Sequence, residues 1–260
     1  MRRFSFIFVT VSIVLLIVLS IQAERMPKDK LLFKQTLYSQ LTTDETLIVD
    51  GYTNQANLFV DIAAIESLYV SSLDEHFKLI PTLMSIEKGG KYRYLGDQYT
   101  KYRYILKLPK LEVDYYIKDC YMTILLKNGT HIQVSIGRLS LMKPSILTSL
   151  TVVNQFGKNN EGSAYLGSIS LDIMVDQVVT IQTICNSVSQ CSPIDTVITD
   201  QKTIHLNLPT DAFYYNQTPL RINYLIGGTE YSETLDTFRY FEQLSTEIPE
   251  NSQNRVYVLN

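Results

Sequence analysis

The sequence is poor in the residues that build metal centres, disulfide scaffolds and disordered tracts. It has three cysteines, three histidines and no tryptophan in 260 residues. Three cysteines are too few for a disulfide scaffold in a chain of this size. Only 11 glycines and 8 prolines are present, and charged residues form no long run, so no disordered tract is indicated.

Motifs of enzymatic chemistry are also missing. The histidines His76, His131 and His205 are far apart in sequence, and none has the spacing of a metal-binding motif such as H-E-x-x-H. A nucleophile elbow, a phosphate-cradling glycine loop and a dinucleotide fingerprint are absent. We therefore predict no catalytic residue, no metal site and no cofactor. A hydrolase whose site leaves no local motif is the remaining enzymatic alternative.

The longest apolar stretch lies at the start of the chain. The run Phe4–Ile21 carries no charge and follows the paired Arg2 and Arg3. It is longer than the apolar core of a signal peptide and reaches the length of a membrane-spanning helix, and no clean small-x-small cleavage pattern ends it. We predict that residues 1–26 form a membrane anchor or uncleaved signal, followed by a linker over 27–39.

The charge pattern around this run predicts its orientation. Paired arginines before an apolar segment hold the N-terminus in the cytoplasm, so the rest of the chain is expected outside the cell. The localisation that follows is a single-pass protein of the cell membrane with extracytoplasmic C-terminal domains. If the signal is cleaved, the protein is secreted instead.

The remainder of the chain has the composition of β structure and repeats itself. It is rich in tyrosine and in β-branched residues, which are typical of strands. Residues 105–136 match residues 205–235 in order and spacing, and residues 58–70 resemble 169–181. An amphipathic helix over 58–77 is the alternative for the first of those two stretches. The ordered matches predict two homologous domains, over 40–144 and 145–245.

Turn and alternation signals give each repeat a hairpin. Asn128-Gly129 and Gly227-Gly228 lie between alternating runs, where a two-residue turn needs positive φ. After the first turn, Ile132, Val134 and Ile136 alternate with polar residues, which predicts one face toward a core and the other toward water. In the second repeat, Leu220, Ile222 and Tyr224 alternate on the way into the turn, and Tyr231 follows it. Each repeat is therefore predicted to be a β-sandwich.

Two short motifs carry a resemblance to a known architecture. Leu108-Pro109 and Tyr115-Tyr116 recur as Leu208-Pro209 and Tyr214-Tyr215. A strand ending in Leu-x-Leu-Pro and followed by a tyrosine resembles the tyrosine corner of immunoglobulin-like and fibronectin type III-like domains. The resemblance implies an all-β fold of two tandem immunoglobulin-like β-sandwich domains behind the N-terminal transmembrane helix. The Cys, Trp and Cys of antibody domains are missing.

The last residues, 246–260, are predicted to be a C-terminal tail. They begin with polar residues around Pro249 and end in an apolar alternation. Val256 and Val258 can add a strand or bind a partner by strand addition, and a loosely ordered tail is the interpretation we take.

The first repeat carries an insertion that provides the candidate binding surface. Residues 91–104 are expected to form a hairpin turning at Gly96-Asp97-Gln98, with tyrosines on one face and cations on the other. Such a surface suits an acidic partner or a wall polymer. In the alternative interpretation, the tyrosines cap the core and the cations protect an edge strand. The residues assigned to the candidate binding surface are Tyr92, Arg93, Tyr94, Lys101, Tyr102, Arg103 and Tyr104.

The positions of the cysteines allow one disulfide bond. Cys185 and Cys191 are six residues apart and can be bridged in an oxidising compartment, although spacing alone does not establish the bond.

The protein is predicted to be a membrane-anchored extracytoplasmic binding or assembly protein without catalytic activity of its own. The alternative is an accessory subunit of an exported envelope enzyme or secretion machine. A protein or cell-wall polymer is the expected partner, and nucleic acid is not.

Overall fold

The computed structural model describes residues 28–145, 149–159, 166–208, 214–215, 217–239, 248 and 254–259. Within these ranges every regular element is a strand, apart from the 3-10 turn η1 (Leu58–Val60). The predicted all-β class is therefore confirmed. The predicted anchor over 1–26 lies outside the described residues, and no helix within them is long and apolar enough to cross a membrane.

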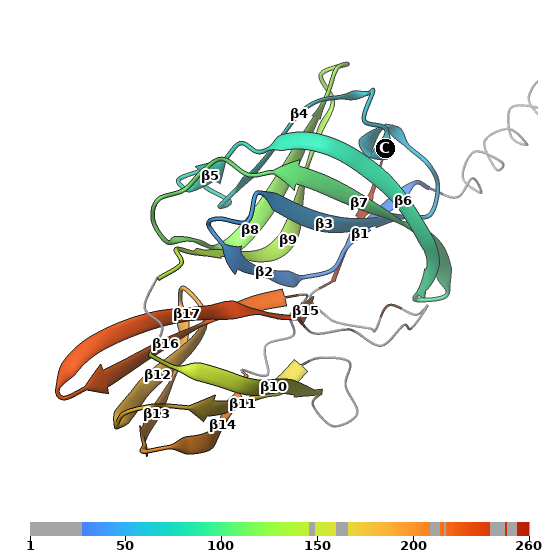
Figure 1. The fold of residues 1–260 in the computed structure, drawn as a ribbon. Coiled ribbons are helices and arrows are strands. Elements are labelled where there is room, and N and C mark those ends of the chain that lie inside the picture. The colour runs from blue at the N-terminus through green and yellow to red at the C-terminus, as the bar shows by residue number, and fades with distance from the viewer. Residues whose placement is uncertain are drawn as a thin grey trace, which may run out of the picture.

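The first unit consists of two sheets that enclose one core (Figure 1). One sheet has the strand order β18 (Arg255–Val258), β1 (Lys30–Phe33), β3 (Thr46–Thr53), β7 (Asp97–Lys107) and β6 (Thr82–Tyr94). The other has the order β15 (Tyr214–Tyr215), β2 (Thr36–Leu41), β9 (His131–Met142), β8 (Tyr115–Leu126), β4 (Ile65–Ser71) and β5 (Lys78–Leu79). Buried side chains from both sheets form a single cluster, which makes this unit a β-sandwich.

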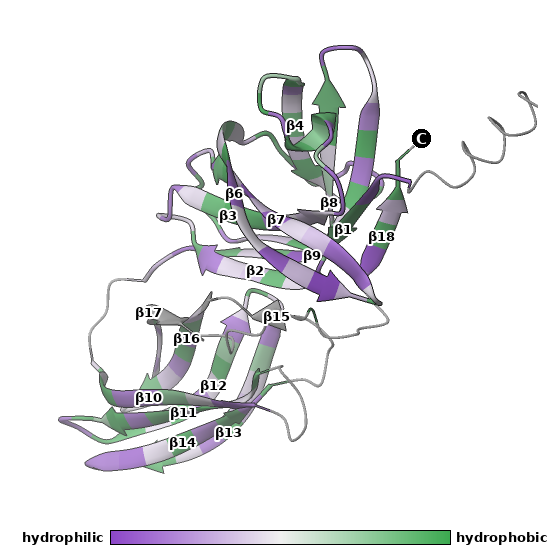
Figure 2. Cartoon of the chain, turned by 90° about the vertical axis from the view of Figure 1, so that its right-hand side faces the viewer, coloured by the Kyte–Doolittle hydropathy of each residue, from purple (hydrophilic) through white to green (hydrophobic). Residues whose placement is uncertain are grey.

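The second unit repeats the two-layer design with fewer strands. One sheet has the order β10 (Thr151–Asn159), β11 (Leu166–Met174) and β14 (Gln201–Asn207). The other has the order β13 (Gln190–Ile198), β12 (Val179–Ser187), β16 (Gln217–Ile226) and β17 (Thr229–Arg239). The second core cluster again combines residues of both sheets. Figure 2 shows the alternating hydrophobic and hydrophilic bands along the strands that such a two-sided arrangement requires.

The predicted hairpins are present. Tight turns join β8 to β9 at Gly129 and β16 to β17 at Gly227-Gly228, and all three glycines have positive φ. Val134 and Ile136 are fully buried, as the alternation in the first repeat predicts. The β-hairpin is therefore the part of each repeat that local sequence specifies best.

One part of the predicted repeat is wrong. Residues 58–70 were matched to 169–181, but 58–60 form η1 and β4 begins at Ile65, whereas 169–173 lie in β11. Strand pairing gives the actual counterpart: β11 pairs with β14 as β3 pairs with β7. The helix alternative for 58–77 is also wrong, because β4 occupies the middle of that stretch.

Two predicted boundaries are corrected by strand pairing. The predicted linker 27–39 contains β1 and most of β2, both of which belong to the first sandwich. The predicted loose tail 246–260 contains β18, which pairs antiparallel with β1. The Tyr257 hydroxyl also binds this unit, since it accepts the Ser135 N–H at 2.7 Å. The C-terminus is therefore a structural strand of the first unit.

Strand β2 packs against both units at once. It lies parallel to β9, and β15 from the second unit lies parallel to it on the other side. Its side chains alternate between the two cores, because Leu37 belongs to the second core cluster and Tyr38 to the first. The two sandwiches are therefore joined by a shared, buried strand.

A glycine makes the approach of β2 possible. Gly137 on β9 has φ +119, and a Cβ built there would lie 2.2 Å from the Thr36 carbonyl oxygen and 2.5 Å from its nitrogen. Both atoms are backbone, so neither can move without displacing β2. Only glycine fits at this position.

We predict that Gly137→Ala destabilises the protein far more than Gly129→Ala. Both glycines have positive φ, but a Cβ at Gly129 meets nothing within 4 Å. Gly129→Ala should cost only the backbone penalty of about 1–2 kcal/mol, and Gly137→Ala at least about 2 kcal/mol more, as is typical when a close contact is overpacked. Urea unfolding of the two variants measures the difference. Equal losses of unfolding free energy in the two variants would contradict the close approach of the Thr36 backbone to Gly137.

Candidate functional site

The predicted binding hairpin forms, with a different turn and a different distribution of tyrosines. Its two-residue turn is Leu95-Gly96, one residue earlier than predicted. A bulge between Lys88 and Lys91 interrupts the pairing of β6 with β7, and beyond it Tyr92 pairs with Tyr99. Tyr92 therefore faces the same side as Tyr99, opposite to Tyr102 and Tyr104.

The predicted single tyrosine face is therefore wrong. Tyr94 and Tyr99 are buried in a small cluster on the outer side of the sheet, which also includes Leu32, Tyr52 and Ile248, with Tyr92 packed against it. The rings of Tyr52 and Tyr92 meet edge to face at 5.4 Å. These tyrosines tie the hairpin to β1, β3 and the C-terminal segment.

The other two tyrosines of the predicted surface are also buried. Tyr104 is fully buried in the first core, and its hydroxyl donates to the Phe59 carbonyl oxygen at 2.9 Å. Burial raises the pKa of its hydroxyl far above the ordinary value. Tyr102 is 8% exposed. Tyr94, Tyr102 and Tyr104 thus stabilise the fold, as the alternative interpretation holds, and none offers a ring to a partner.

The cations of the hairpin are only partly free. Lys101 forms an ion pair with Asp50, and only 14% of its side chain is exposed. Arg93 and Arg103 are exposed. The Arg93 carbonyl oxygen accepts the Ile248 N–H at 2.9 Å. The hairpin therefore exposes Lys91 and the two arginines, while the ion pair of Lys101 interrupts the basic row expected from the sequence.

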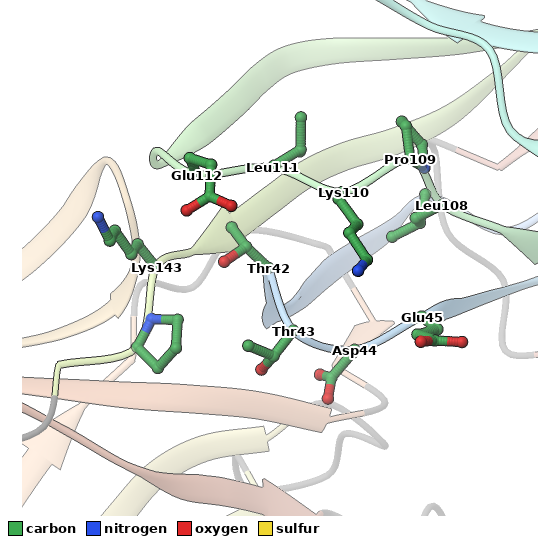
Figure 3. Close-up of a pocket in the computed structure, with 11 residues that line it drawn as sticks. Thr42, Thr43, Asp44, Glu45, Leu108, Pro109, Lys110, Leu111, Glu112 and Lys143 are labelled. Carbon is green, nitrogen blue, oxygen red and sulfur yellow. The ribbon is translucent and has the colours of Figure 1, made fainter.

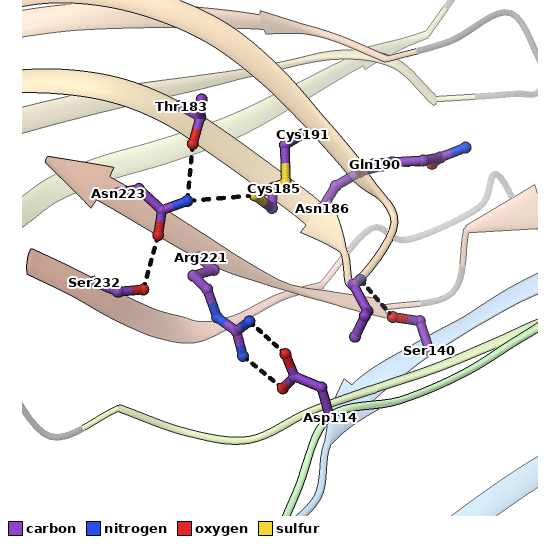
Figure 4. Close-up of a disulfide and its surroundings, with 11 residues drawn as sticks. Asp114, Ser140, Thr183, Cys185, Asn186, Gln190, Cys191, Arg221, Asn223 and Ser232 are labelled. Atoms are coloured by element: carbon purple, nitrogen blue, oxygen red, sulfur yellow. Dashed lines mark hydrogen bonds and ion pairs between the residues drawn. A yellow bond between two sulfur atoms is a disulfide. The ribbon is translucent and has the colours of Figure 1, made fainter.

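The junction between the units contains a more elaborate polar arrangement (Figure 4). Arg221 on β16 makes a two-pronged ion pair with Asp114 of the first unit, at 2.7 and 2.8 Å. Arg221 also donates to the Lys143 carbonyl oxygen at 2.9 Å, and the Lys143 N–H donates to Asp114 at 2.8 Å. The hydrogen bonds from Arg221 lower the pKa of the Asp114 carboxyl and raise that of the guanidinium. Bidentate geometry fixes the orientation of one unit on the other.

A disulfide-closed hairpin completes the junction. Cys185 on β12 and Cys191 on β13 are bonded, with S–S at 2.02 Å. Between them, the Asn186 carbonyl oxygen accepts the Ser39 hydroxyl at 3.1 Å and the Val188 N–H donates to the Ser140 hydroxyl at 2.9 Å. Ser39 and Ser140 are buried residues of β2 and β9. The disulfide thus shapes the loop that docks on the first unit.

An open groove of about 390 Å³ lies beside this junction (Figure 3). One side is the turn between β2 and β3, and the other is the segment between β7 and β8. The lining combines apolar residues with charges of both signs and consists of Thr42, Thr43, Asp44, Glu45, Leu108, Pro109, Lys110, Leu111, Glu112, Lys143 and Pro144. Sequence reasoning missed it, because its two walls are more than 60 residues apart in the chain. The repeated Leu-x-Leu-Pro motif supplies one wall.

Tyr115, the residue predicted to form a tyrosine corner, contacts residues more than 30 positions upstream and not the nearby backbone. The Tyr115 ring packs edge to face on Phe77 at 6.2 Å, and its hydroxyl interacts with the Lys78 backbone. The counterpart in the second repeat, Tyr214-Tyr215, is strand β15. Tyr115 therefore packs within one sheet of the first unit, and the Tyr214-Tyr215 strand joins the two units.

The described residues include the three histidines, one free cysteine and acidic residues that could serve as metal ligands. No group of three or more His, Cys, Asp or Glu residues among them is placed to hold a metal ion. His205 is exposed and hydrogen-bonds the Ser170 hydroxyl at 2.8 Å, and burial raises the pKa of the Cys120 thiol far above its ordinary range. Such a thiol is not a nucleophile at neutral pH.

The carboxyl of Glu233 lies in a hollow between β10 and β17 and has a raised pKa. Glu233 is 6% exposed, and desolvation raises the pKa of its side chain. It accepts the Ser149 N–H at 3.2 Å and the Tyr224 hydroxyl at 3.3 Å. These partners give it a structural role in holding the start of the second unit against β17.

Comparisons with known proteins leave the family open. No family model and no curated protein matches the sequence. Among solved structures, a DUF4785 family protein from Legionella pneumophila matches over 81% of this chain and 58% of its own length, with 9% identity and a TM-score of 0.24. CBD12 from CALX1.2 matches over 76% and 82%, with 11% identity and a TM-score of 0.22. The titin domains Z1Z2, solved in complex with telethonin, match over 80% and 95%, with 9% identity and a TM-score of 0.23.

Likenesses with such low TM-scores support no statement about fold or function. The chain spans less than two thirds of the length of the DUF4785 family protein. The description of the fold therefore rests on the strand pairing and cores of this protein alone.

We predict that the junction ion pair stabilises the protein at neutral pH and is lost in acid. Because the pKa of Asp114 is lowered from its ordinary value of 3.8, its contribution is present above that value and disappears as the pH falls through the lower folded-state pKa. Asp114→Asn should cost about 1 kcal/mol at pH 7, in the range of charged hydrogen bonds that are partly solvated. The cost should begin to fall below pH 3.8 and vanish once the pH is below the folded-state pKa of Asp114.

Urea unfolding at a series of pH values measures this difference. Asp119→Asn, which removes an exposed carboxylate elsewhere on the first unit, is the matched control and should change little at any pH. A pH-independent cost of Asp114→Asn would contradict the role assigned to the charge.

Proposed function

We propose that this protein is a single-pass membrane protein that displays two immunoglobulin-like sandwiches outside the cell and acts by binding a protein or a wall polymer. The apolar run Phe4–Ile21 supports the anchor. The Cys185–Cys191 bond supports an oxidising, extracytoplasmic location, where such bonds persist.

The strand order supports the immunoglobulin-like assignment. In the first unit, the order β1-β3-β7-β6 corresponds to strands A, B, E and D, and the order β4-β8-β9 corresponds to C, F and G. In the second unit, β10-β11-β14 corresponds to A, B and E, and β12-β16-β17 to C, F and G. The disulfide joins neighbouring strands of one sheet, unlike the inter-sheet bond of antibody domains.

The main support for a binding function is the groove that lies beside the junction of the two units. Leu108, Leu111 and Pro144 give it apolar surface, while Lys110 and Glu112 add charges of both signs at its edge. An apolar floor with a polar rim is the usual composition of a protein-binding site. Because both walls of the groove are held by strands of the first sandwich, the groove is formed before a partner arrives, which lowers the entropic cost of binding.

The proposal is tested by site-specific photo-crosslinking in native membranes. A photoreactive residue replaces Lys110 in the groove, or Lys202 as a matched control on β14 of the second unit; both lysines are exposed. We expect a specific adduct from position 110 and none from position 202. Identical adducts from both positions, or none from position 110, would argue against the groove as the binding site.

A further inference from the structure

The tip of the β6–β7 hairpin exposes a leucine in a strained conformation. Leu95 is 64% exposed and has φ 49, and Gly96 follows with φ 82. A two-residue turn with positive φ at both positions favours Asn-Gly or Gly-Gly, and the β16–β17 turn of this chain, which has similar positive φ values, is Gly227-Gly228. A bulky apolar residue is disfavoured there by backbone strain and by contact with water. Turn formation therefore does not account for Leu95.

This tip lies at the end of the first unit from which the chain continues toward the predicted anchor. Lys30, at the start of β1, forms an ion pair with Asp97 beside the turn. Asn54 binds the same segment, because its side chain accepts the Lys30 N–H at 2.7 Å and donates to the Lys28 carbonyl oxygen at 2.9 Å. Lys28 is therefore fixed close to the hairpin tip.

The apolar run ends a short distance away along the chain. Residues 22–27 separate Ile21 from Lys28, and a fully extended chain of that length spans at most about 25 Å. A bilayer that holds the apolar run therefore lies within that distance of Lys28, whose segment contacts Asp97 beside the tip.

Further exposed apolar residues belong to the same end. The loop after β3 carries Leu58, 50% exposed, and Ile62, 45% exposed. The exposed cations Lys28 and Arg93 are also near, together with the exposed anion Asp61. The opposite end of the sandwich holds Lys143, where the chain passes to the second unit.

We propose that this end of the first unit rests on the outer leaflet of the bilayer that holds the anchor, with Leu95 inserted at the boundary between headgroups and acyl chains. The inference rests on the proposed function, since it needs the apolar run to span the membrane. A single leucine gains little from leaving water, but the tether keeps it at high local concentration, so a weak contact persists. The second unit, and the groove at the opposite end of the first unit, then point away from the membrane.

The absence of tryptophan from the sequence makes a direct test available. In the full chain, Leu95→Trp introduces one tryptophan at the tip, and Leu73→Trp introduces one at the opposite end of the same sandwich. Both positions are 64% exposed, so the two variants are matched. Each is reconstituted into phosphatidylcholine and phosphatidylglycerol vesicles that contain brominated acyl chains, which quench tryptophan on contact.

The result expected is strong quenching and a blue shift for Leu95→Trp, with little of either for Leu73→Trp. Equal quenching of the two, or none in protein that floats with the vesicles, would overturn the inference and leave the anchor standing. Protein that fails to float with vesicles would overturn the anchor and this inference together.

A second pair of variants guards against misfolding of the turn. Gln98→Trp lies at an exposed position on β7 next to the turn, where a strand accepts tryptophan readily. Adding Leu95→Asn to it creates the Asn-Gly turn that hairpins favour, so folding is preserved while the apolar contact is removed. Quenching of Trp at position 98 should fall in the double variant. Unchanged quenching would show that Leu95 makes no contact with lipid.

Discussion

The structure depends on one strand that serves two cores. β2 inserts Leu37 into the second core and Tyr38 into the first, and it is paired on one side by β9 and on the other by β15. Because successive side chains of a strand point to opposite faces, a strand placed between two units can be buried on both. Removing either neighbour would expose apolar side chains to water. The two sandwiches are therefore stabilised together.

The two sandwiches are joined by strands that one part of the chain adds to a sheet of another part. β15 comes from the second unit and extends a sheet of the first, while β18 comes from the end of the chain and extends the other sheet. Each addition satisfies backbone groups at an edge that would otherwise be open to unwanted pairing. The disulfide hairpin and the Arg221–Asp114 pair then fix the angle between the units.

The sequence predicted correctly those turns and strands that depend on residues close to one another in the chain. The turns at Gly129 and Gly227-Gly228 and the burial of Val134 follow from residues close in the chain. Strand β2 was missed, and the strand at Val256 and Val258 was only the alternative to a loose tail, because the partners of both lie about 100 to 230 residues away, where no periodicity signals pairing. The tyrosine face was predicted wrongly because the turn is Leu95-Gly96, which pairs Tyr92 with Tyr99 and so turns Tyr92 away from the face of Tyr102 and Tyr104.

The candidate site was the least predictable part, for the same reason. Tyrosines such as Tyr104 could be identified as a cluster, but only packing decides whether their rings meet a core or a partner. The groove requires Lys110 and Thr43 to be brought together by folding, and neither belongs to a recognisable motif. What the sequence did contribute is the repeated Leu-x-Leu-Pro segment, which forms one wall at Leu108 and Pro109.

The central claim is that the two sandwiches form one cooperative structure through β2. Scanning calorimetry of the full chain in detergent micelles tests it most directly, because independent domains unfold separately. A single transition, with equal calorimetric and van't Hoff enthalpies, is the predicted result. Two resolved transitions, each with the enthalpy of one sandwich, would contradict the shared strand.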